Sequence, residues 1–395
     1  MSEYPQASGD VDSVAPAELA ERLRNGEPVS VLDVRNRNEM EAWPLSGESV
    51  TTHHVPYYRF VEANVNDSTG DLAGEVREAL DEPILVICGR GEASGYVAEQ
   101  LSREGIDAAN LAEGMRGWAR VYHAVELPLD ADHAGDATVV QYQRPSSGCL
   151  AYLVVSGDEA VVVDPLRASV ERYLADARDH GAELTAAVDT HVHADHVSGV
   201  RELAREAGAE VVLPAGATER GLAFDARLVE GGDRIEVGET GLDAVALPGH
   251  TSEMLGFRLG DLLFAGDTVF LESVARPDLE AGDEGAPDMA RQLHATISTV
   301  DDDVRVAPAH FSDAARPDDR GAYVARMGNL RDRLPALSLP RDEFVDHLLE
   351  AMPPRPANYE EIIEVNLGRE SADDETSFEL ELGPNNCAAT AAGAD

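Results

Sequence analysis

The sequence contains no lysine, so all 31 of its basic residues are arginine. This absence excludes every mechanism that depends on a lysine side chain. Among these are a Walker-A phosphate loop, a pyridoxal phosphate or aldolase Schiff base, and a lysine general base. Any catalysis by this chain must therefore use other residue types.

Cysteines and long apolar runs are also scarce. Cys88, Cys149 and Cys387 are too few and too widely spaced for a disulfide framework, which suits a reducing compartment. No run of 18 apolar residues occurs, so we expect no membrane-spanning helix. The first residues have neither the basic segment nor the apolar core of a signal peptide. We therefore predict a cytoplasmic protein with no membrane partner.

Acidic residues dominate the charge. Asp and Glu number 75, which gives a formal net charge of −44. A surface this acidic repels phosphates and excludes nonspecific nucleic-acid binding. Self-repulsion would strain the folded chain in dilute buffer, but at about 1 M salt the Debye length falls to roughly 3 Å and this cost fades. We predict a folded protein from a halophile that accumulates salt in its cytosol.

Strand–loop–helix alternation indicates an α/β fold with a parallel sheet in the first part of the chain. A helix followed by a buried strand is expected over 17–33, and a strand followed by an amphipathic helix over 84–105. Further strands and helices follow from about residue 139. We predict a first α/β domain over 12–127, a linker over 128–138, a second domain over 139–368 and an acidic tail over 369–395.

The densest group of potential metal ligands is the run HVHADH at 191–196, which follows an apolar strand-like segment. A turn after a strand can direct several side chains to one point, which a helix or strand cannot do at this spacing. Three further ligand residues each follow an apolar run. The seven candidates are His191, His193, Asp195, His196, His250, Asp267 and His310. We expect them to converge at one edge of a sheet.

This motif resembles that of the metallo-β-lactamase superfamily, specifically its glyoxalase II and persulfide dioxygenase branches, over about residues 139–365. The resemblance implies an αββα sandwich with the metal at one edge of two packed sheets. It also implies that Asp164, in the run VVVDP, supports the ligand loop.

The two branches imply different metals. The dioxygenase pattern places one Fe(II) per chain on His191, His250 and Asp267, and two imidazoles with one carboxylate suit non-haem iron and O₂. The hydrolase pattern uses all seven positions for two Zn(II) ions, whose bridging hydroxide attacks a thioester. The other four positions, which either bind a second metal or orient the iron ligands, are His193, Asp195, His196 and His310.

Three features outside the ligands favour the dioxygenase branch. The segment RPDL at 276–279 resembles that branch, whereas glyoxalase II proteins more often have Phe-Glu-Gly there. The part after His310 is short, and no lysine is available for the glutathione contacts of a full glyoxalase II substrate domain. The segment QYQRPSSGCLAYLV resembles the dioxygenase start. Arg276 and Asp278 are candidates for substrate binding, with a salt bridge between them as the alternative.

Cys88 stands between an apolar strand and a helix that begins near Ser94. Backbone N–H groups in such a loop, together with the helix N-terminus, stabilise a thiolate, a bound anion or a persulfide. The surrounding pattern resembles a rhodanese domain over about 12–127, with VLDVR at 31–35 and LAEGMRGW at 111–118. It departs from that family in having Gly89 directly after the cysteine and an arginine, Arg90, one position later. Cys88 is the candidate persulfide carrier and Arg90 a candidate catalytic residue.

The leading hypothesis is a persulfide dioxygenase–rhodanese fusion. It would oxidise a low-molecular-weight thiol persulfide with O₂ to sulfite, and Cys88 would exchange sulfane sulfur with thiosulfate or sulfite. One alternative is a glyoxalase II-like dinuclear zinc thioester hydrolase with an accessory rhodanese module. Another is a non-catalytic protein that binds or senses persulfide. A homodimer is left open as the oligomeric state.

Overall fold

The computed structural model describes residues 5, 7, 9, 11–129, 135–350, 352–383 and 386–389. It divides the chain into two compact units. The first consists of Met1–Val121 with Arg144–Ser147 and Leu382–Pro384, and the second of the rest. The domain limits at 127, 138 and 368 stay predictions. In the structure, strand β6 (His123–Leu127) is part of the second unit, where it pairs with β7 (Thr138–Gln143).

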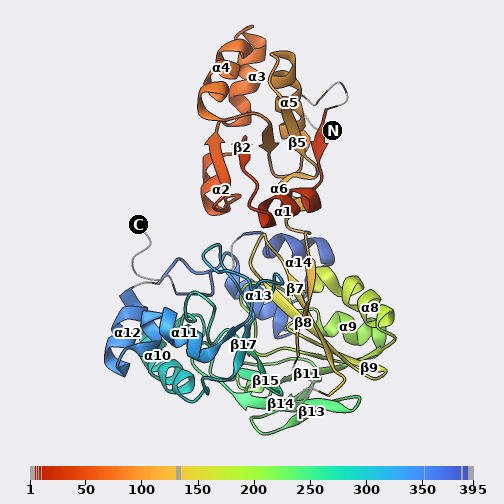
Figure 1. Ribbon diagram of the computed structural model, residues 1–395, viewed down its shortest axis with the longest axis vertical. Helices are drawn as coiled ribbons and strands as arrows, with labels where there is room; N and C mark the ends of the chain where they lie inside the picture. The colour runs from red at the N-terminus through yellow and green to blue at the C-terminus, as the bar shows by residue number, and fades with distance from the viewer. Residues whose placement is uncertain are drawn as a thin grey trace. The chain divides into compact units, whose positions relative to one another are not determined.

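The first unit is built on a five-stranded sheet whose neighbouring strands are all parallel, in the order β1-β5-β4-β2-β3 (Figure 1). Its strands and helices are β1 (Ser13–Val14), β2 (Val29–Asp33), β3 (Val50–His54), β4 (Ile84–Ile87), β5 (Ala108–Leu111), α1 (Pro16–Arg24), α2 (Arg37–Ala42), α3 (Tyr57–Val65), α4 (Thr69–Ala79), α5 (Glu92–Arg103) and α6 (Gly114–Trp118).

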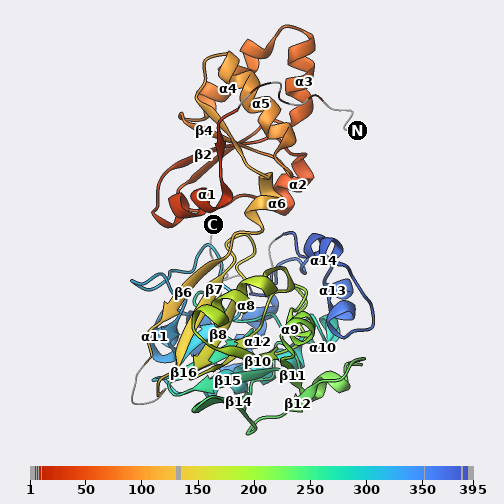
Figure 2. The ribbon, with the colours of Figure 1, turned by 90° about the vertical axis from the view of Figure 1, so that its right-hand side faces the viewer.

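Helices cover both faces of this sheet (Figure 2). Residues of α3, α4 and α5 share one apolar cluster with the sheet, and residues of α1 and α6 share another. All four residues of β4 are buried, because a strand in such a position has no solvent-facing side. The predicted α/β fold and both predicted strand–helix patterns, over 17–33 and 84–105, are confirmed.

The second unit contains two mixed sheets. The seven-stranded sheet has the order β12-β11-β10-β9-β8-β7-β6, and the six-stranded sheet has the order β13-β14-β15-β16-β17-β18. The strands not yet bounded are β8 (Leu150–Ser156), β9 (Glu159–Val163), β10 (Glu183–Val188), β11 (Glu210–Pro214), β12 (Arg227–Val229), β13 (Arg234–Val237), β14 (Thr240–Ala246), β15 (Leu255–Leu259), β16 (Leu262–Gly266), β17 (Arg305–Pro308) and β18 (Ala325–Arg326).

Helices flank the two sheets and complete a four-layer sandwich. The α-helices are α8 (Val170–Asp179), α9 (Val200–Ala207), α10 (Gly282–Ser298), α11 (Met327–Arg333), α12 (Arg341–Glu350), α13 (Tyr359–Asn366) and α14 (Asp374–Leu380). The 3₁₀ helices are η1 (Arg167–Ser169), η2 (Ala215–Thr218) and η3 (Pro335–Ser338).

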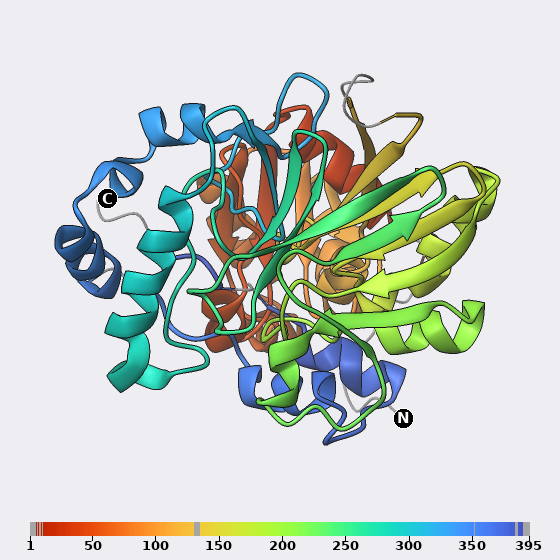
Figure 3. The same cartoon turned by 90° about the horizontal axis from the view of Figure 1, so that it is seen from below.

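Three apolar clusters show the order of the layers. One fills the space between the two sheets, with Val161 and Phe257 among its members. A second joins α8 and α9 to the seven-stranded sheet, and a third joins α10 to the six-stranded sheet. In Figure 3, α10 (teal) and the two helices α8 and α9 (yellow-green) lie on opposite sides of the strands. The expected αββα sandwich is confirmed.

Strand direction brings the predicted ligands to one edge. β16 and β17 are parallel, and β14 runs in the same direction because β15 is antiparallel to both of its neighbours. The carboxyl ends of β14, β16 and β17 therefore lie at the same edge of their sheet. Among the described residues, no helix combines the length and the apolar character needed to cross a bilayer.

Candidate metal centre

All seven predicted ligands are buried, with at most 6% of any residue exposed. Four lie in the loop between β10 and α9, and the other three follow the ends of β14, β16 and β17. The structure thus brings the HVHADH run and the three later residues into one buried region, in groups of neighbouring donor atoms.

The first group consists of His191, His250 and Asp267, whose ligand atoms all lie within 4.8 Å of one another. The Nε2 atoms of His191 and His250 are 3.9 and 3.7 Å from Asp267 Oδ2. His250 donates its Nδ1–H to the carbonyl oxygen of Arg276 at 2.8 Å, which leaves its Nε2 lone pair available. His191 Nε2 and Asp267 Oδ2 are buried without hydrogen-bond partners. These orphaned donors fit a divalent metal ion.

Thr190 fixes the orientation of His191. Its hydroxyl donates to Asp164 Oδ2 at 3.0 Å and so accepts from His191 Nδ1 at 2.9 Å. Gly266 permits this arrangement, since a Cβ at that position would lie 2.6 Å from Thr190 Oγ1. Burial lowers the pKa of His191 well below its ordinary value, so the ring is neutral, which is the form that binds metal.

His193 belongs to another group, with Asp164 and Asp189. Its Nε2 is 3.1 Å from Asp164 Oδ1, and the same oxygen accepts the backbone N–H of Thr190 at 2.7 Å. Asp164 therefore supports the ligand loop through two residues. Burial raises the pKa of Asp189 to about 6, although His193 opposes this shift. His193 Nδ1 is buried and makes no hydrogen bond, and it lies 3.9 Å from Asp195 Oδ1, a spacing that a shared metal ion would fit.

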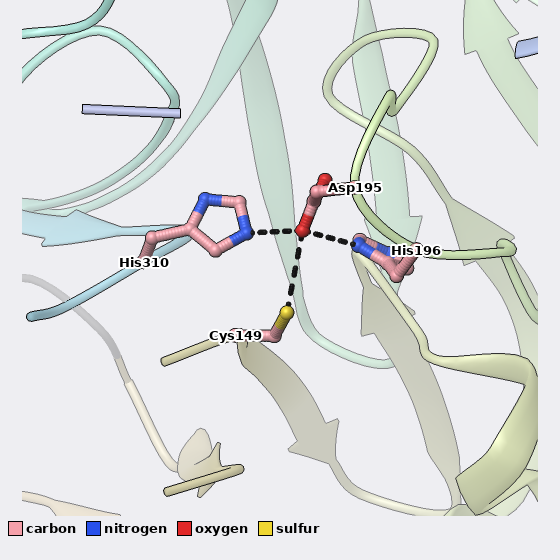
Figure 4. Close-up of side chains that lie close together, drawn as sticks. All are labelled: Cys149, Asp195, His196 and His310. Atoms are coloured by element: carbon pink, nitrogen blue, oxygen red, sulfur yellow. Dashed lines mark hydrogen bonds and ion pairs between the residues drawn. The ribbon is translucent and has the colours of Figure 1, made fainter. Parts of the chain in front are cut away.

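Asp195, His196 and His310 form a group that also includes Cys149 (Figure 4). Asp195 Oδ2 lies 2.7 Å from His310 Nε2, 3.2 Å from His196 Nδ1 and 3.3 Å from Cys149 Sγ. Burial opposes ionisation of Asp195, but His310 and His196 hold the pKa of this carboxyl well below its usual range. The sequence did not predict Cys149 at this position.

Cys387 is a second unpredicted thiol near the ligands. It is fully buried, and its sulfur forms a group with ligand atoms of Asp267 and His310. Its carbonyl oxygen accepts the backbone N–H of Arg276 at 3.0 Å, and Ala389 N donates to Val274 O at 2.9 Å. Residues 386–389 therefore run beside 274–276, although they lie in the predicted acidic tail.

Arg276 and Asp278 form a bidentate ion pair with distances of 2.7 and 3.0 Å, and both are buried. Arg276 also donates to the carbonyls of Pro354 and Asn386 at 2.8 and 3.0 Å. With its own carbonyl bonded to His250, Arg276 links a ligand histidine to the C-terminal segment. These contacts favour a positioning role, and substrate binding by the pair stays a prediction.

Glu253 is a further buried residue that sequence reasoning missed. Its Oε1 accepts the backbone N–H of Val192 at 3.0 Å and an N–H of Arg220 at 2.7 Å. It thereby holds the backbone between the first two histidines of the HVHADH run. A lone glutamate between a predicted ligand and a strand carries no distinctive pattern, so only the fold reveals this contact.

In the first unit, Cys88 lies between β4 and α5 and is 6% exposed. Its sulfur accepts a hydrogen bond from Gly91 N at 3.1 Å and lies at the same distance from Ser94 Oγ, a hydroxyl that it shares with Asn110 Oδ1 at 2.7 Å. The backbone N–H of Met115 donates to the carbonyl of Cys88 at 2.8 Å and fixes the loop from α6. Arg90 is exposed on this loop. Donors directed at the sulfur are the arrangement that stabilises a thiolate or a persulfide anion.

Comparisons with known proteins agree with this architecture. The profile of the metallo-beta-lactamase superfamily matches residues 144–337, and that of the rhodanese-like domain matches residues 15–121. The chain is 30% identical to the mitochondrial persulfide dioxygenase ETHE1 of Homo sapiens over 58% of this chain and 86% of that protein. It is 31% identical to a hydroxyacylglutathione hydrolase of Synechococcus sp. (strain WH7803), over 43% of this chain and 71% of that protein.

A solved structure supports the same relationship. The crystal structure of ETHE1 from Myxococcus xanthus superposes with a TM-score of 0.50 at 27% identity. The match covers 58% of this chain and 97% of that one.

Proposed function

The chain belongs to the metallo-beta-lactamase superfamily and carries a rhodanese-like domain ahead of the metallo-beta-lactamase domain. We propose that it is a persulfide dioxygenase. Its substrates are a low-molecular-weight thiol persulfide and O₂. The balanced reaction is RSSH + O₂ + H₂O → RSH + SO₃²⁻ + 2H⁺. The sulfane sulfur is oxidised to sulfite by four electrons, and O₂ is reduced.

The observation that carries this proposal is the His191–His250–Asp267 group. Two imidazoles and one carboxylate converge there, and two of their donor atoms, His191 Nε2 and Asp267 Oδ2, are buried without hydrogen-bond partners. This donor set is the one that suits non-haem Fe(II) with open coordination positions. When bound, ferrous iron supplies the redox chemistry with O₂ and the Lewis acidity that a persulfide sulfur requires.

The charges of the group favour an anionic substrate. Asp267 contributes one negative charge and the two imidazoles none, so a divalent ion there keeps one net positive charge. Burying a charge without a partner is costly, and a persulfide anion supplies that partner. Thr190 and the carbonyl of Arg276 hold His191 and His250 in place, which limits reorganisation when substrate binds.

Cys88 is proposed to carry sulfane sulfur as a persulfide and to exchange it with thiosulfate or sulfite. Support comes from the donors Gly91 N and Ser94 Oγ, which face its sulfur. The exposed Arg90 on the same loop is proposed to attract the anionic sulfur donor or acceptor. Carrying sulfane sulfur and consuming a persulfide are related reactions, which is a chemical reason for joining the two domains in one chain.

The test is O₂ uptake by the anaerobically purified, iron-loaded full chain with a thiol persulfide. We expect uptake to be lost in His191→Ala and retained in Cys88→Ala, since the two residues belong to separate sites. Turnover would exclude a protein that only binds or senses persulfide. Loss of uptake in Cys88→Ala as well would contradict the proposed division of labour.

A dinuclear zinc thioester hydrolase is the second candidate. It is favoured by one observation, namely that all seven ligand positions of such a site are occupied by suitable residues. The hydroxyacylglutathione hydrolase relative is matched over a smaller share of its length than the persulfide dioxygenase. Metal analysis separates the candidates: about one iron per chain supports the dioxygenase, and two zinc ions per chain would overturn it.

A further inference from the structure

We propose that Ser94 and Asn110 form a switch that follows the charge on Cys88. The Ser94 hydroxyl donates to the Cys88 sulfur while that sulfur is an anion. It donates to Asn110 once the charge has moved to the outer sulfur of a persulfide. Asn110 is then a positioning residue for sulfur transfer. The persulfide step rests on the proposed carrier role of Cys88, whereas the response to ionisation does not.

One hydroxyl hydrogen faces two acceptors. Ser94 Oγ lies 3.1 Å from Cys88 Sγ and 2.7 Å from Asn110 Oδ1. A serine hydroxyl has a single hydrogen, so it donates to one of these acceptors at a time. Ser94 is fully buried, and a buried hydroxyl without an acceptor costs free energy. Either orientation avoids this cost, so the charge on the sulfur decides between them.

The secondary structure holds the three side chains together. Cys88 directly follows β4, Ser94 lies in the first turn of α5, and Asn110 lies on β5, which is parallel to β4. The backbone N–H of Asn110 donates to Asp12 O at 2.8 Å and fixes this residue in the sheet. A Cβ at Gly95 would lie 3.8 Å from Asn110 Nδ2. The amide nitrogen is therefore turned toward α5, and its oxygen toward Ser94.

The other donor to the sulfur is fixed. Gly91 N lies 3.1 Å from Cys88 Sγ, and a backbone N–H cannot turn away from its acceptor. Gly91 has a φ of 91°, and a Cβ there would lie 3.0 Å from Glu113 N, so this close approach requires glycine. The loop thus has one permanent donor and one donor that can turn. Only the Ser94 hydroxyl responds to the state of Cys88.

Sulfur transfer moves the charge away from the Cys88 sulfur. The thiolate attacks the outer sulfur of thiosulfate: Cys88–S⁻ + S–SO₃²⁻ → Cys88–S–S⁻ + SO₃²⁻. A sulfur–sulfur bond to Cys88 forms, the bond in thiosulfate breaks, and sulfite leaves with the electron pair. No proton is exchanged, and the total charge is unchanged. The inner sulfur is now uncharged and a weak acceptor, so the Ser94 hydroxyl turns to Asn110.

Asn110→Leu removes the second acceptor and keeps a side chain of similar size. The thiol and the persulfide each lose one neutral hydrogen bond, whereas the thiolate loses none. One substitution therefore has two effects: it favours the thiolate over the thiol, and it disfavours the persulfide relative to the thiolate. Each effect is expected to be about fivefold, the factor that corresponds to one neutral hydrogen bond. A purely structural role of Asn110 would not produce this pair of effects.

The first measurement is the rate of iodoacetamide alkylation of Cys88 in the full chain, by mass spectrometry, at a pH where the native rate still rises with pH. We expect Asn110→Leu to react about fivefold faster. In a Ser94→Ala background the same substitution should change nothing, because Asn110 acts through the hydroxyl. Ser13→Ala is the matched control, since Ser13 pairs with Asn110 in the sheet but its hydroxyl donates to Val11 O.

The second measurement is the persulfide content of Cys88. The native chain and Asn110→Leu are equilibrated without O₂ at one fixed ratio of thiosulfate to sulfite. The pH is one at which the native alkylation rate has levelled off, so that the thiolate is compared with the persulfide. Mass spectrometry of the Cys88 peptide measures the gain of one sulfur atom. We expect the ratio of persulfide to unmodified peptide to fall about fivefold in the variant.

Slower alkylation of Asn110→Leu, which is the result if the amide only supports the loop or donates to Ser94, would overturn the switch. So would an unchanged persulfide ratio. Emission of Trp43 and Trp118 shows whether the first unit of each variant is folded, and Asn110→Ala removes the same acceptor if leucine is not accommodated. A native chain that takes up no sulfur would contradict the carrier role of Cys88, whereas the alkylation rates decide the switch independently.

Discussion

The Nδ1 atom of His310 lies 2.6 Å from Oδ1 of Asp267, and this contact decides which carboxylate oxygen is free. With Oδ1 engaged, Oδ2 is left toward His191 and His250. Burial alone would lower the pKa of His310, but Asp267 and Asp195 raise it well above its ordinary value. His310 is therefore a donor that holds a metal-ligand carboxylate in orientation.

We predict that His310→Phe, which keeps a ring but removes both nitrogens, weakens iron binding by about 10–100-fold. Asp267 would lose the donor that orients it, and its buried carboxylate would lack a partner. The measurement is an anaerobic Fe(II) titration of the purified variant. His294→Phe is the control, since His294 lies on α10 and belongs to none of the metal-ligand groups among the described residues. Equal affinities of His310→Phe and the native chain would refute this role.

Each of the seven predicted ligands follows an apolar run of the sequence, and the end of such a run predicts the end of a strand. The ligands share one buried region because these strand ends lie together. Cys149 escaped prediction because it lies at the start of a strand. β8 is antiparallel to β9, and β9 is parallel to β10. The amino end of β8 therefore reaches the same edge as the carboxyl end of β10. Strand direction must be known before such a residue can be placed, and no local pattern gives it.

The predicted acidic tail illustrates a different limit. Composition averages over a segment, and 369–395 is acidic as a whole. The structure nevertheless contains helix α14 there, with Phe378 and Leu380 buried, and it buries Cys387 in an apolar cluster. A few inward-facing residues among many exposed carboxylates do not change the average, so composition misses them.

The Cys88 loop gives a prediction about thiol reactivity. Ser94→Ala removes a hydroxyl that lies 3.1 Å from the sulfur and can donate to it or to Asn110 Oδ1 at 2.7 Å. Because a hydrogen bond to a charged group contributes about 1.5–3 kcal/mol, we expect alkylation of Cys88 at neutral pH to slow by about tenfold or more. Mass spectrometry of the Cys88 peptide after timed iodoacetamide treatment measures the rate. Ser102→Ala, at an exposed position of the same helix, should leave it unchanged.

A buried ion pair supports the first unit. Arg35 Nη2 lies 2.6 Å from Asp33 Oδ2, and the two side chains are 4% and 1% exposed. Asp33→Ala would leave the guanidinium buried without its charge partner, so we expect a loss of roughly 3–5 kcal/mol in the free energy of unfolding.

Tryptophan fluorescence is a selective probe for this change. The sequence has two tryptophans, Trp43 and Trp118, and both lie in the first unit. Urea unfolding followed by their emission should shift to lower urea in Asp33→Ala, while Fe(II) binding by the second unit is retained. Asp107→Ala removes an exposed aspartate of the same unit and is the control. An unchanged fluorescence midpoint in Asp33→Ala would contradict the prediction.

The ion pair between Asp261 and Arg305 predicts a pH dependence for the second unit. Two contacts of 2.8 and 3.0 Å join them, and the hydrogen bonds from Arg305 lower the pKa of Asp261. A carboxyl with a lowered pKa stabilises the fold above its unfolded value of about 3.9, and this contribution is lost as pH falls through the folded value.

The expected result is that Asp261→Asn lowers the free energy of unfolding at pH about 7 by up to about 1 kcal/mol. The difference from the native chain should shrink as pH falls through the lowered pKa of folded Asp261 and vanish where the native carboxyl is also protonated. Urea unfolding of the metal-free chain by circular dichroism measures both values. Asp301→Asn, at an exposed site near the same strands, should show no such dependence. A difference that persists unchanged in acid would exclude the ion pair as its cause.

The acidic charge gives the last prediction, which concerns salt. Even if every one of the 31 arginines neutralised one carboxylate, 75 − 31 = 44 of the acidic residues would have no basic partner. Their mutual repulsion acts over roughly 10 Å at about 0.1 M salt but only about 3 Å at 1 M, so added salt should stabilise the folded state. We expect the melting temperatures of both units to rise between about 0.1 M and about 3 M KCl. The first unit is followed by tryptophan emission and the second by circular dichroism beyond that transition. Equal melting temperatures at the two salt concentrations would show that the net charge is not an adaptation to salt.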